Sequence, residues 1–291
     1  MTWFLLSLAA AFGLATADAL TKRFLSDLPA YRMGVVRILS TAPWMILALI
    51  FIPSAAPDGT FWLAMGAALP LELAAFFLYM KALKLSPLSL SLPFLAFTPV
   101  FMILTGRFIL GESIGPGGVA GIGLIVLGAY VLNLSRMKAG FLEPVRAVIR
   151  EPGSWIMLLV SFLYSLTAPL GKVAVLHSSP WFFAAVYNLV LSALIVGVWP
   201  VASGRAPVRS IFSRPVPMAL IGLAAAAENF AHMTAIAQVE AAYMIAIKRL
   251  SLLFGVLYGA RWFGEQNIRE RLAGAAIMIV GVFLIRWAQG G

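Results

Sequence analysis

Long apolar stretches recur along the whole chain and are separated by short polar segments. Ten of these stretches approach the roughly 20 residues that an α-helix needs to cross the apolar part of a bilayer. They are too long for the strands of a membrane β-barrel, and lipid leaves a backbone few options other than helix. The pattern therefore predicts an all-α membrane protein with ten transmembrane helices, at residues 2–21, 31–52, 60–82, 88–110, 116–135, 153–172, 180–200, 215–237, 241–263 and 270–289.

The composition supports this prediction and narrows the chemistry. Hydrophobic residues make up 62% of the 291 residues and charged residues only 11%, whereas soluble domains carry roughly 25% charged residues. The absence of cysteine excludes disulfides and thiolate chemistry, and two histidines predict neither a metal site nor a cofactor. We find no nucleophile–base–acid set and no ATPase signature, so the sequence predicts a protein that is not an enzyme.

The chain has a net charge of +10, and its basic residues are concentrated in the loops on one side of the predicted helices. Most Lys and Arg residues lie in loops 1–2, 3–4, 5–6, 7–8 and 9–10, which share one side if the helices alternate. Basic residues in short loops stay cytoplasmic, so both termini are predicted on the non-cytoplasmic side of the cell (inner) membrane. The charge then contacts anionic lipid headgroups, and no nucleic-acid partner is predicted.

Residues recur at an offset of 153 between the two halves of the chain. Because five helices form an odd number, the second copy is inverted in the membrane, and the charges agree: loop 1–2 is basic, whereas its counterpart, loop 6–7, is not. We predict repeats at 1–138 and 153–291, joined by a cytoplasmic surface linker at 139–152. The matching positions are Gly111-Glu112 with Gly264-Glu265, Ala120-Gly121 with Ala273-Gly274, Gly128 with Gly281, Gly106 with Gly259, and Phe101 with Phe254.

With these motifs the chain resembles the drug/metabolite transporter superfamily, in its ten-helix EamA-like branch. Each fourth span ends in Gly-Glu, and a fifth span rich in small residues follows it. The resemblance implies transport of a small molecule between inverted repeats and leaves the substrate open. Many EamA-like members are expected to have cytoplasmic termini, whereas the charges of this chain predict the opposite.

Two carboxylates, Glu72 and Glu228, lie in the middle of spans three and eight. A charge at the bilayer centre is costly and marks a functional site by default. We predict that both acids bind substrate or couple protons; the alternative is neutralisation by neighbouring cations. His232 follows Glu228 by four residues and shares its face, either as a proton relay or as a buried, hydrogen-bonded side chain.

The adjacent cations Lys248 and Arg249 occur in the otherwise apolar ninth span. They are predicted to recognise an anionic group, or else to neutralise the two acids in a closed network. The pair is also similar to the phosphate-binding pair of plastid phosphate translocators. Asp18 and Arg37, near the cytoplasmic ends of spans one and two, are predicted to form a structural ion pair; the alternative is that Arg37 extends to the lipid headgroups.

Further polar and helix-breaking residues complete the predicted site. Tyr187 and Asn188, in the middle of span seven, either contact substrate or bond to a neighbouring helix. Pro93 and Pro99 interrupt span four and are predicted hinge positions. Span nine has no proline, so its hinge is predicted near Gly255.

These features favour a secondary transporter of a small polar metabolite, anionic or zwitterionic, that works by alternating access with proton coupling. An alternative is a flippase for a phosphate-bearing lipid intermediate, which requires a lateral opening between helices. A third possibility is an intramembrane enzyme or receptor without transport. The expected partners are the small-molecule substrate and the lipid bilayer, and the expected assembly is a monomer or a homodimer.

Overall fold

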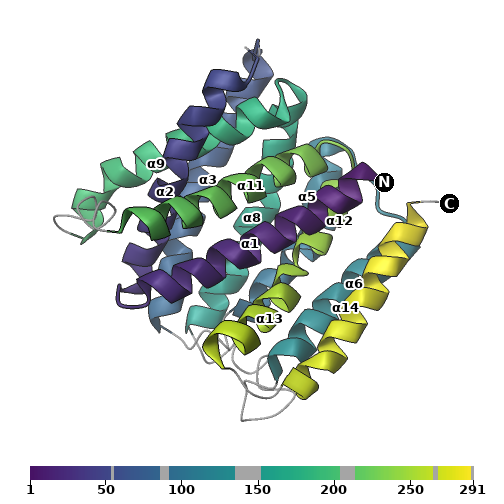
Figure 1. The fold of residues 1–291 in the computed structure, drawn as a ribbon. Coiled ribbons are helices and arrows are strands. Elements are labelled where there is room, and N and C mark those ends of the chain that lie inside the picture. The colour runs from purple at the N-terminus through teal and green to yellow at the C-terminus, as the bar shows by residue number, and fades with distance from the viewer. Residues whose placement is uncertain (54–55, 86–91, 135–151, 204–213, 265–267, 290–291) are drawn as a thin grey trace.

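The computed structural model describes residues 1–53, 56–85, 92–134, 152–203, 214–264 and 268–289, and this part of the chain is helical throughout (Figure 1). The predicted linker at 139–152 lies outside the described residues except for Pro152. The elements are α1 (Thr2–Leu25), α2 (Ala30–Phe51), α3 (Gly59–Leu85), the 3-10 helix η1 (Leu92–Phe97), α5 (Thr98–Leu110), α6 (Pro116–Leu134), α8 (Pro152–Leu176), α9 (Pro180–Ser203), α11 (Pro215–Ile236), α12 (Ala241–Lys248), α13 (Ser251–Phe263) and α14 (Ile268–Ala288).

The helices reproduce the predicted spans. Seven spans are long and apolar enough to cross a membrane, with α12 and α13 counted as one interrupted span. Three shorter apolar segments, Phe94–Leu110, Pro116–Leu132 and Ala273–Ala288, complete the set of ten. The prediction of an all-α membrane protein is confirmed, and several helices extend a few residues beyond their predicted apolar cores.

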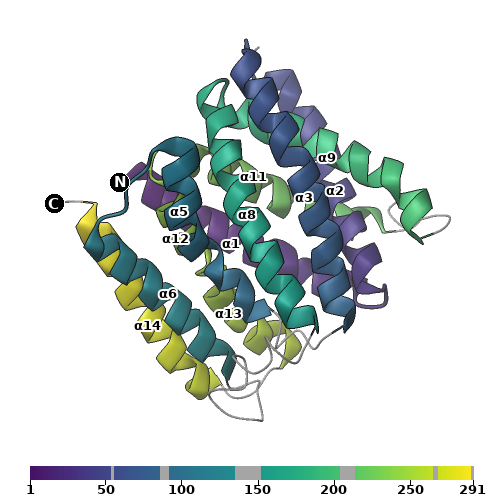
Figure 2. The ribbon, with the colours of Figure 1, turned by 180° about the vertical axis from the view of Figure 1, so that it is seen from behind.

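The inverted repeat is visible in how α6 and α14 cross. These fifth helices of the two repeats lie side by side along one edge of the bundle in both views (Figures 1 and 2). A Cβ on Gly121 would lie 2.8 Å from the carbonyl oxygen of Gly281, and a Cβ on Gly274 would lie 2.7 Å from that of Gly128. The two contacts exchange partners at the offset of 153, as a two-fold relation between inverted copies requires.

Aromatic pairs repeat the same symmetry between first and fourth spans. Phe12 of α1 meets Phe254 of α13 edge to face at 5.4 Å and 88°. Phe162 of α8 meets Phe101 of α5 at 5.7 Å and 87°. Each first helix therefore packs on the fourth span of the other repeat.

The Gly-Glu motif has a structural reason at its glycine. Gly111 and Gly264 end α5 and α13 with φ of 70° and 61°, a left-handed conformation that strains residues with a Cβ. The amide of Gly111 donates to the carbonyl of Arg107, which closes the last turn of α5. The same turn therefore ends the fourth span of both repeats.

Ion pairs between loops show which loops share an end of the bundle. Arg214, before α11, binds Asp27 of loop 1–2 through two bonds of 2.9 and 2.7 Å, which lowers the pKa of Asp27. At the other end, His177 of loop 6–7 binds Asp58 of loop 2–3 at 2.7 Å. The backbone N–H of Phe61, and then this bond, lower the pKa of Asp58. The start of α1 and the end of α14 lie at the same end of the bundle as the connections from α2 to α3 and from α8 to α9, which contain Asp58 and His177; this is here called the terminal end (Figure 1).

Candidate functional site

Two interrupted helices, one from each repeat, meet in the interior of the bundle. Span four changes from η1 to α5 at Thr98, with Pro93 in η1 and Pro99 in the first turn of α5. Span nine changes from α12 to α13 across Arg249 and Leu250. Such breaks leave backbone groups and side chains near the middle of the membrane free to face a substrate.

Gly255, the predicted hinge position, lies inside α13, and the hinge there stays a prediction. Around the break, the amides of Leu250 and Leu252 donate to carbonyls three residues earlier, those of Ile247 and Arg249. These bonds form tight 3-10 turns, which change the helix direction without glycine or proline. No residue type in the sequence marks this break except the two adjacent cations.

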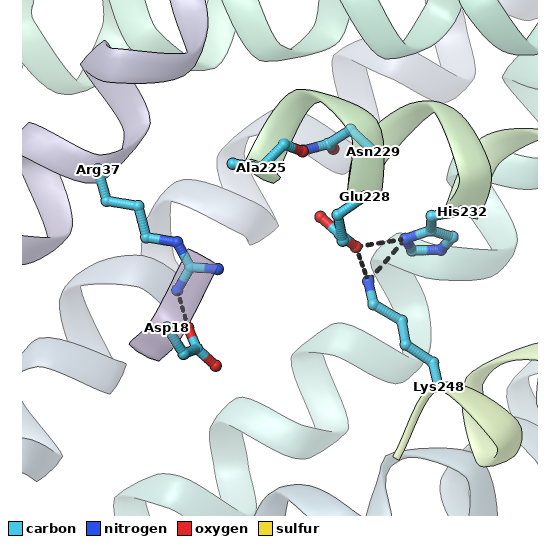
Figure 3. A network of polar contacts seen from close by, with 7 residues as sticks. All are labelled: Asp18, Arg37, Ala225, Glu228, Asn229, His232 and Lys248. Carbon is cyan, nitrogen blue, oxygen red and sulfur yellow. Dashed lines mark hydrogen bonds and ion pairs between the residues drawn. The ribbon is translucent and has the colours of Figure 1, made fainter. Parts of the chain in front are cut away.

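Glu228, His232 and Lys248 form a compact group, here called the charge cluster (Figure 3). Lys248 Nζ lies 2.5 Å from Glu228 Oε1 and 2.8 Å from His232 Nδ1, and His232 Nδ1 lies 3.7 Å from the same carboxylate oxygen. The side chains of Glu228, His232 and Lys248 are only 8%, 13% and 15% exposed. The structure thus pairs Lys248 with one acid, in the way the neutralising alternative describes.

The contacts assign the proton of His232. An ammonium group has only donors, so Lys248 donates to Nδ1, and His232 is neutral with its hydrogen on Nε2. That Nε2 is buried and has no hydrogen-bond partner in the described part of the chain. The side-chain amide of neighbouring Asn229 donates to the carbonyl of Ala225 on its own helix rather than to the charge cluster (Figure 3).

Asp18 and Arg37 form the ion pair expected from the sequence, between α1 and α2 (Figure 3). The pair lies within electrostatic range of Glu228. The Asp18 side chain nevertheless keeps 55% of its surface accessible, and the Arg37 side chain keeps 27%. Both side chains of this pair therefore keep accessible surface, unlike the three side chains of the charge cluster.

Arg249 separates from Lys248 at the helix break. Its Nη2 donates to the hydroxyl of Thr98 at 2.9 Å, and this hydroxyl donates to the carbonyl of Leu95. The guanidinium thus joins the interrupted spans of both repeats. Among the described residues, no carboxylate lies within 4.0 Å of Arg249, and its Nε has no hydrogen-bond partner.

Glu72 lies within one helical turn of the position in its repeat that corresponds to Glu228 in the other. Glu72 is on α3 beside Thr167 of α8, whereas Glu228 is on α11 against Gly13 of α1. Each acid therefore lies on the third helix of its repeat, against the first helix of the other. The two differ in their partners, since no cation of the described chain lies within 4.0 Å of Glu72.

Tyr187 and Asn188 of α9 lie close to this region. Tyr187 packs on Phe183 with 5.0 Å between ring centroids and interacts electrostatically with Glu72. The side-chain oxygen of Asn188 is buried without a hydrogen-bond partner in the described part of the chain. The predicted site residues thus form two groups, one around Lys248 and one around Glu72 and the tyrosines.

Sequence reasoning missed a second buried ion pair, near the terminal end. Lys172 Nζ of α8 contacts Glu112 Oε1 at 2.6 Å, with side-chain exposures of only 10% and 12%. Lys172 also donates to the carbonyl of Val239 at 2.6 Å, and Glu112 Oε2 accepts the amide of Ala241 at 2.9 Å. The available signal was the repeat itself, which places a Lys late in each first span and a Glu after each fourth span.

The sequence also predicts no role for His177, which the structure pairs with Asp58 across the two repeats. Within the described ranges, no cluster of three or more His, Asp or Glu side chains is arranged to hold a metal ion.

Comparisons with known proteins agree with this architecture. The family model of EamA-like transporters matches residues 1–134 and 151–287, which are the two repeats. No curated protein matches the chain. A solved structure titled only as the crystal structure of a protein superposes with a TM-score of 0.77 at 16% sequence identity, covering 97% of this chain and 96% of the other. At that identity the likeness supports the fold alone.

Proposed function

Because the chain belongs to the EamA-like transporter family, we propose that it is a secondary transporter that moves a small anionic or zwitterionic metabolite by alternating access. The substrate binds where the interrupted spans four and nine meet. One repeat rocks against the other around this point. The accessible surface beside Asp18 and Arg37 gives the substrate room next to the charged side chains.

Arg249 carries this proposal. Among the described interior cations, Arg37, Lys172 and Lys248 each have a carboxylate partner, whereas Arg249 contacts only the neutral hydroxyl of Thr98. A buried positive charge without a partner is unfavourable, and an anionic substrate group would balance it. The planar guanidinium suits a carboxylate or phosphate, which it can bind through two bonds. Lys248 then serves to balance Glu228 rather than to bind the anion.

A thermal-shift screen of small phosphate- and carboxylate-bearing metabolites tests this role. Metabolites that stabilise the wild type should no longer stabilise Arg249→Gln. Loss of a charge-assisted hydrogen bond removes about 1.5–3 kcal/mol of binding free energy, which weakens the affinity roughly 10- to 100-fold. Arg249→Lys should retain part of the binding. Arg214→Gln is the matched control, since it removes an exposed arginine outside the spans. Equal binding by Arg249→Gln and wild type would contradict the proposal.

Glu72 is the acid we propose for proton coupling. Lys248 already balances Glu228, whereas the carboxylate of Glu72 is held beside the neutral Thr167. A proton taken up from one side and released to the other would balance Glu72 during transport. Substrate flux in liposomes should respond to an imposed pH gradient, and Glu72→Gln should abolish that response while Glu228→Gln keeps it. A wild-type pH response in Glu72→Gln would exclude this step.

A pocket on the side of the bundle favours the flippase as a second candidate. It has a volume of about 440 Å³, an apolar lining and a position between the ends of α2 and α11 and the start of α9. Phe51 and Trp181 line it and are 77% and 55% exposed, so the pocket faces the surroundings of the bundle. An acyl chain could occupy it while the headgroup binds Arg249. Translocation of fluorescent phospholipid analogues in proteoliposomes, with no flux of soluble anions, would favour this function over metabolite transport.

A further inference from the structure

Glu112 is the centre of a contact between the two repeats. It follows the fourth span of the first repeat, and its two carboxylate oxygens bind Lys172 and the amide of Ala241, both from the second repeat. Lys172 adds a bond to the carbonyl of Val239, so α8 and the start of α12 are held together. We call Glu112, Lys172, Val239 and Ala241 the terminal gate.

We propose that the terminal gate holds the terminal end of the transporter shut, and that α12 links this gate to the charged residues at the break in span nine. The proposal rests on the transport cycle described above. It makes Glu112 a positioning residue, because it acts on the site through α12.

The geometry of α12 supports this link. The helix has eight residues and is about 12 Å long at 1.5 Å per residue. Its first amide binds Glu112, and its other end carries Lys248 and Arg249. A carboxylate at a helix N-terminus satisfies a free amide and opposes the helix dipole, so Glu112 fixes the start of α12 firmly. A short, buried helix moves as one piece, and opening the gate therefore displaces both cations.

Other contacts are consistent with a closed terminal end. Thr2 Oγ1 of the first repeat donates to Gln238 Oε1 of the second at 2.6 Å. The Asp58–His177 pair also joins the repeats there, but its side chains are 53% and 42% exposed. Exposed pairs hold weakly, whereas removing one partner of a buried pair leaves a charge without compensation. The buried Glu112–Lys172 pair is therefore the contact that should decide whether this end opens.

Thiol labelling tests the proposal without any substrate, because the chain has no cysteine. Ser7→Cys places a nearly isosteric reporter on the buried face of α1, with Trp3 and Ala10, which pack in the same core as α12. Ser251→Cys places a second reporter just beyond the break in span nine. The protein is held in nanodiscs, so that a membrane-impermeant maleimide reaches both ends.

Lys172→Gln and Glu112→Gln should each raise the labelling rate of Ser7→Cys about tenfold or more. The labelling rate of Ser251→Cys should rise in the same variants, because α12 moves as one piece and displaces the break in span nine. Asp58→Asn is the matched control at the same end and should change either rate less than about twofold. Lys172→Arg keeps the positive charge, so its labelling rates should stay close to those of the protein with Lys172.

The outcomes separate the two parts of the proposal. Unchanged labelling in both gate variants, each shown to be folded by a monodisperse elution profile, would overturn the gate. An equal increase with Asp58→Asn would also overturn it, because the effect would then not be specific to the buried pair. An increase at Ser7→Cys alone would overturn the link through α12. The labelling experiment uses no substrate, so its result does not depend on whether Arg249 binds an anion. Equally, a result that overturns the gate would leave the proposed anion binding at Arg249 unaffected.

Discussion

At the scale of single residues, most interior charges of the described chain form ion pairs, whereas Glu72 and Arg249 have no oppositely charged partner within 4.0 Å. The sequence predicts pairs that are close along the chain, such as Asp18 with Arg37 and the i, i+4 neighbours Glu228 and His232. It does not predict which acid Lys248 binds, because that choice depends on where α11 lies beside α12. The unpaired state of Arg249 depends equally on tertiary packing.

The pairing of Glu228 with Lys248 has a measurable consequence for stability. Glu228→Gln leaves the ammonium of Lys248 in the interior without its carboxylate, which should lower the free energy of unfolding by about 3–5 kcal/mol. Lys248→Met alone should be similarly destabilising. The double variant should recover most of the loss, since neither charge then remains unbalanced. A double-mutant cycle by denaturant unfolding in detergent measures the coupling, and purely additive effects would contradict it.

At the scale of helices, apolar stretches and glycine motifs predict where spans lie and where they end, but not every interruption. Pro93 and Pro99 predict an interruption where η1 changes to α5, because proline removes a backbone hydrogen-bond donor. The break at Arg249 has no such marker and forms through tight turns that only the packed structure specifies. This is why the sequence did not predict the interruption at Arg249 and Leu250.

The glycines of α6 also differ in ways the sequence cannot show. A Cβ on Gly128 would lie 2.7 Å from the carbonyl oxygen of Gly274, whereas a Cβ on Gly123 would meet nothing within 4 Å. Gly128→Ala should destabilise the α6–α14 crossing by about 1–3 kcal/mol through overpacking. Gly123→Ala on the same helix is the matched control and should be neutral or stabilising by up to about 1 kcal/mol. Thermal unfolding of the two variants provides the comparison, and an equal effect would contradict the close approach.

At the scale of the whole molecule, the repeat offset made the inverted architecture predictable, because matching motifs such as Gly111 and Gly264 recur in order. The glycine crossings of the structure follow the same offset, and the aromatic pairs join the corresponding spans of the two repeats. The functional asymmetry was only partly predictable. The sequence shows that Lys248 and Arg249 belong to the second repeat alone, but only packing distinguishes the balanced Lys248 from the unbalanced Arg249.

The orientation of the molecule in the membrane is a prediction of its own. The structure places Asp27 and Arg214 at one end and Asp58 and His177 at the other, so each end has a fixed set of loops. Basic residues gather in the loops at the end of Asp27, and the positive-inside rule therefore places this end in the cytoplasm and both termini outside. In intact cells an impermeant thiol reagent should label Thr2→Cys but not Ser26→Cys, which should react only after the membrane is permeabilised; both positions are exposed, so accessibility within the protein does not limit labelling. The reverse pattern would place the termini in the cytoplasm, as expected of many EamA-like proteins, and would mean that loop charge does not set the orientation of this chain.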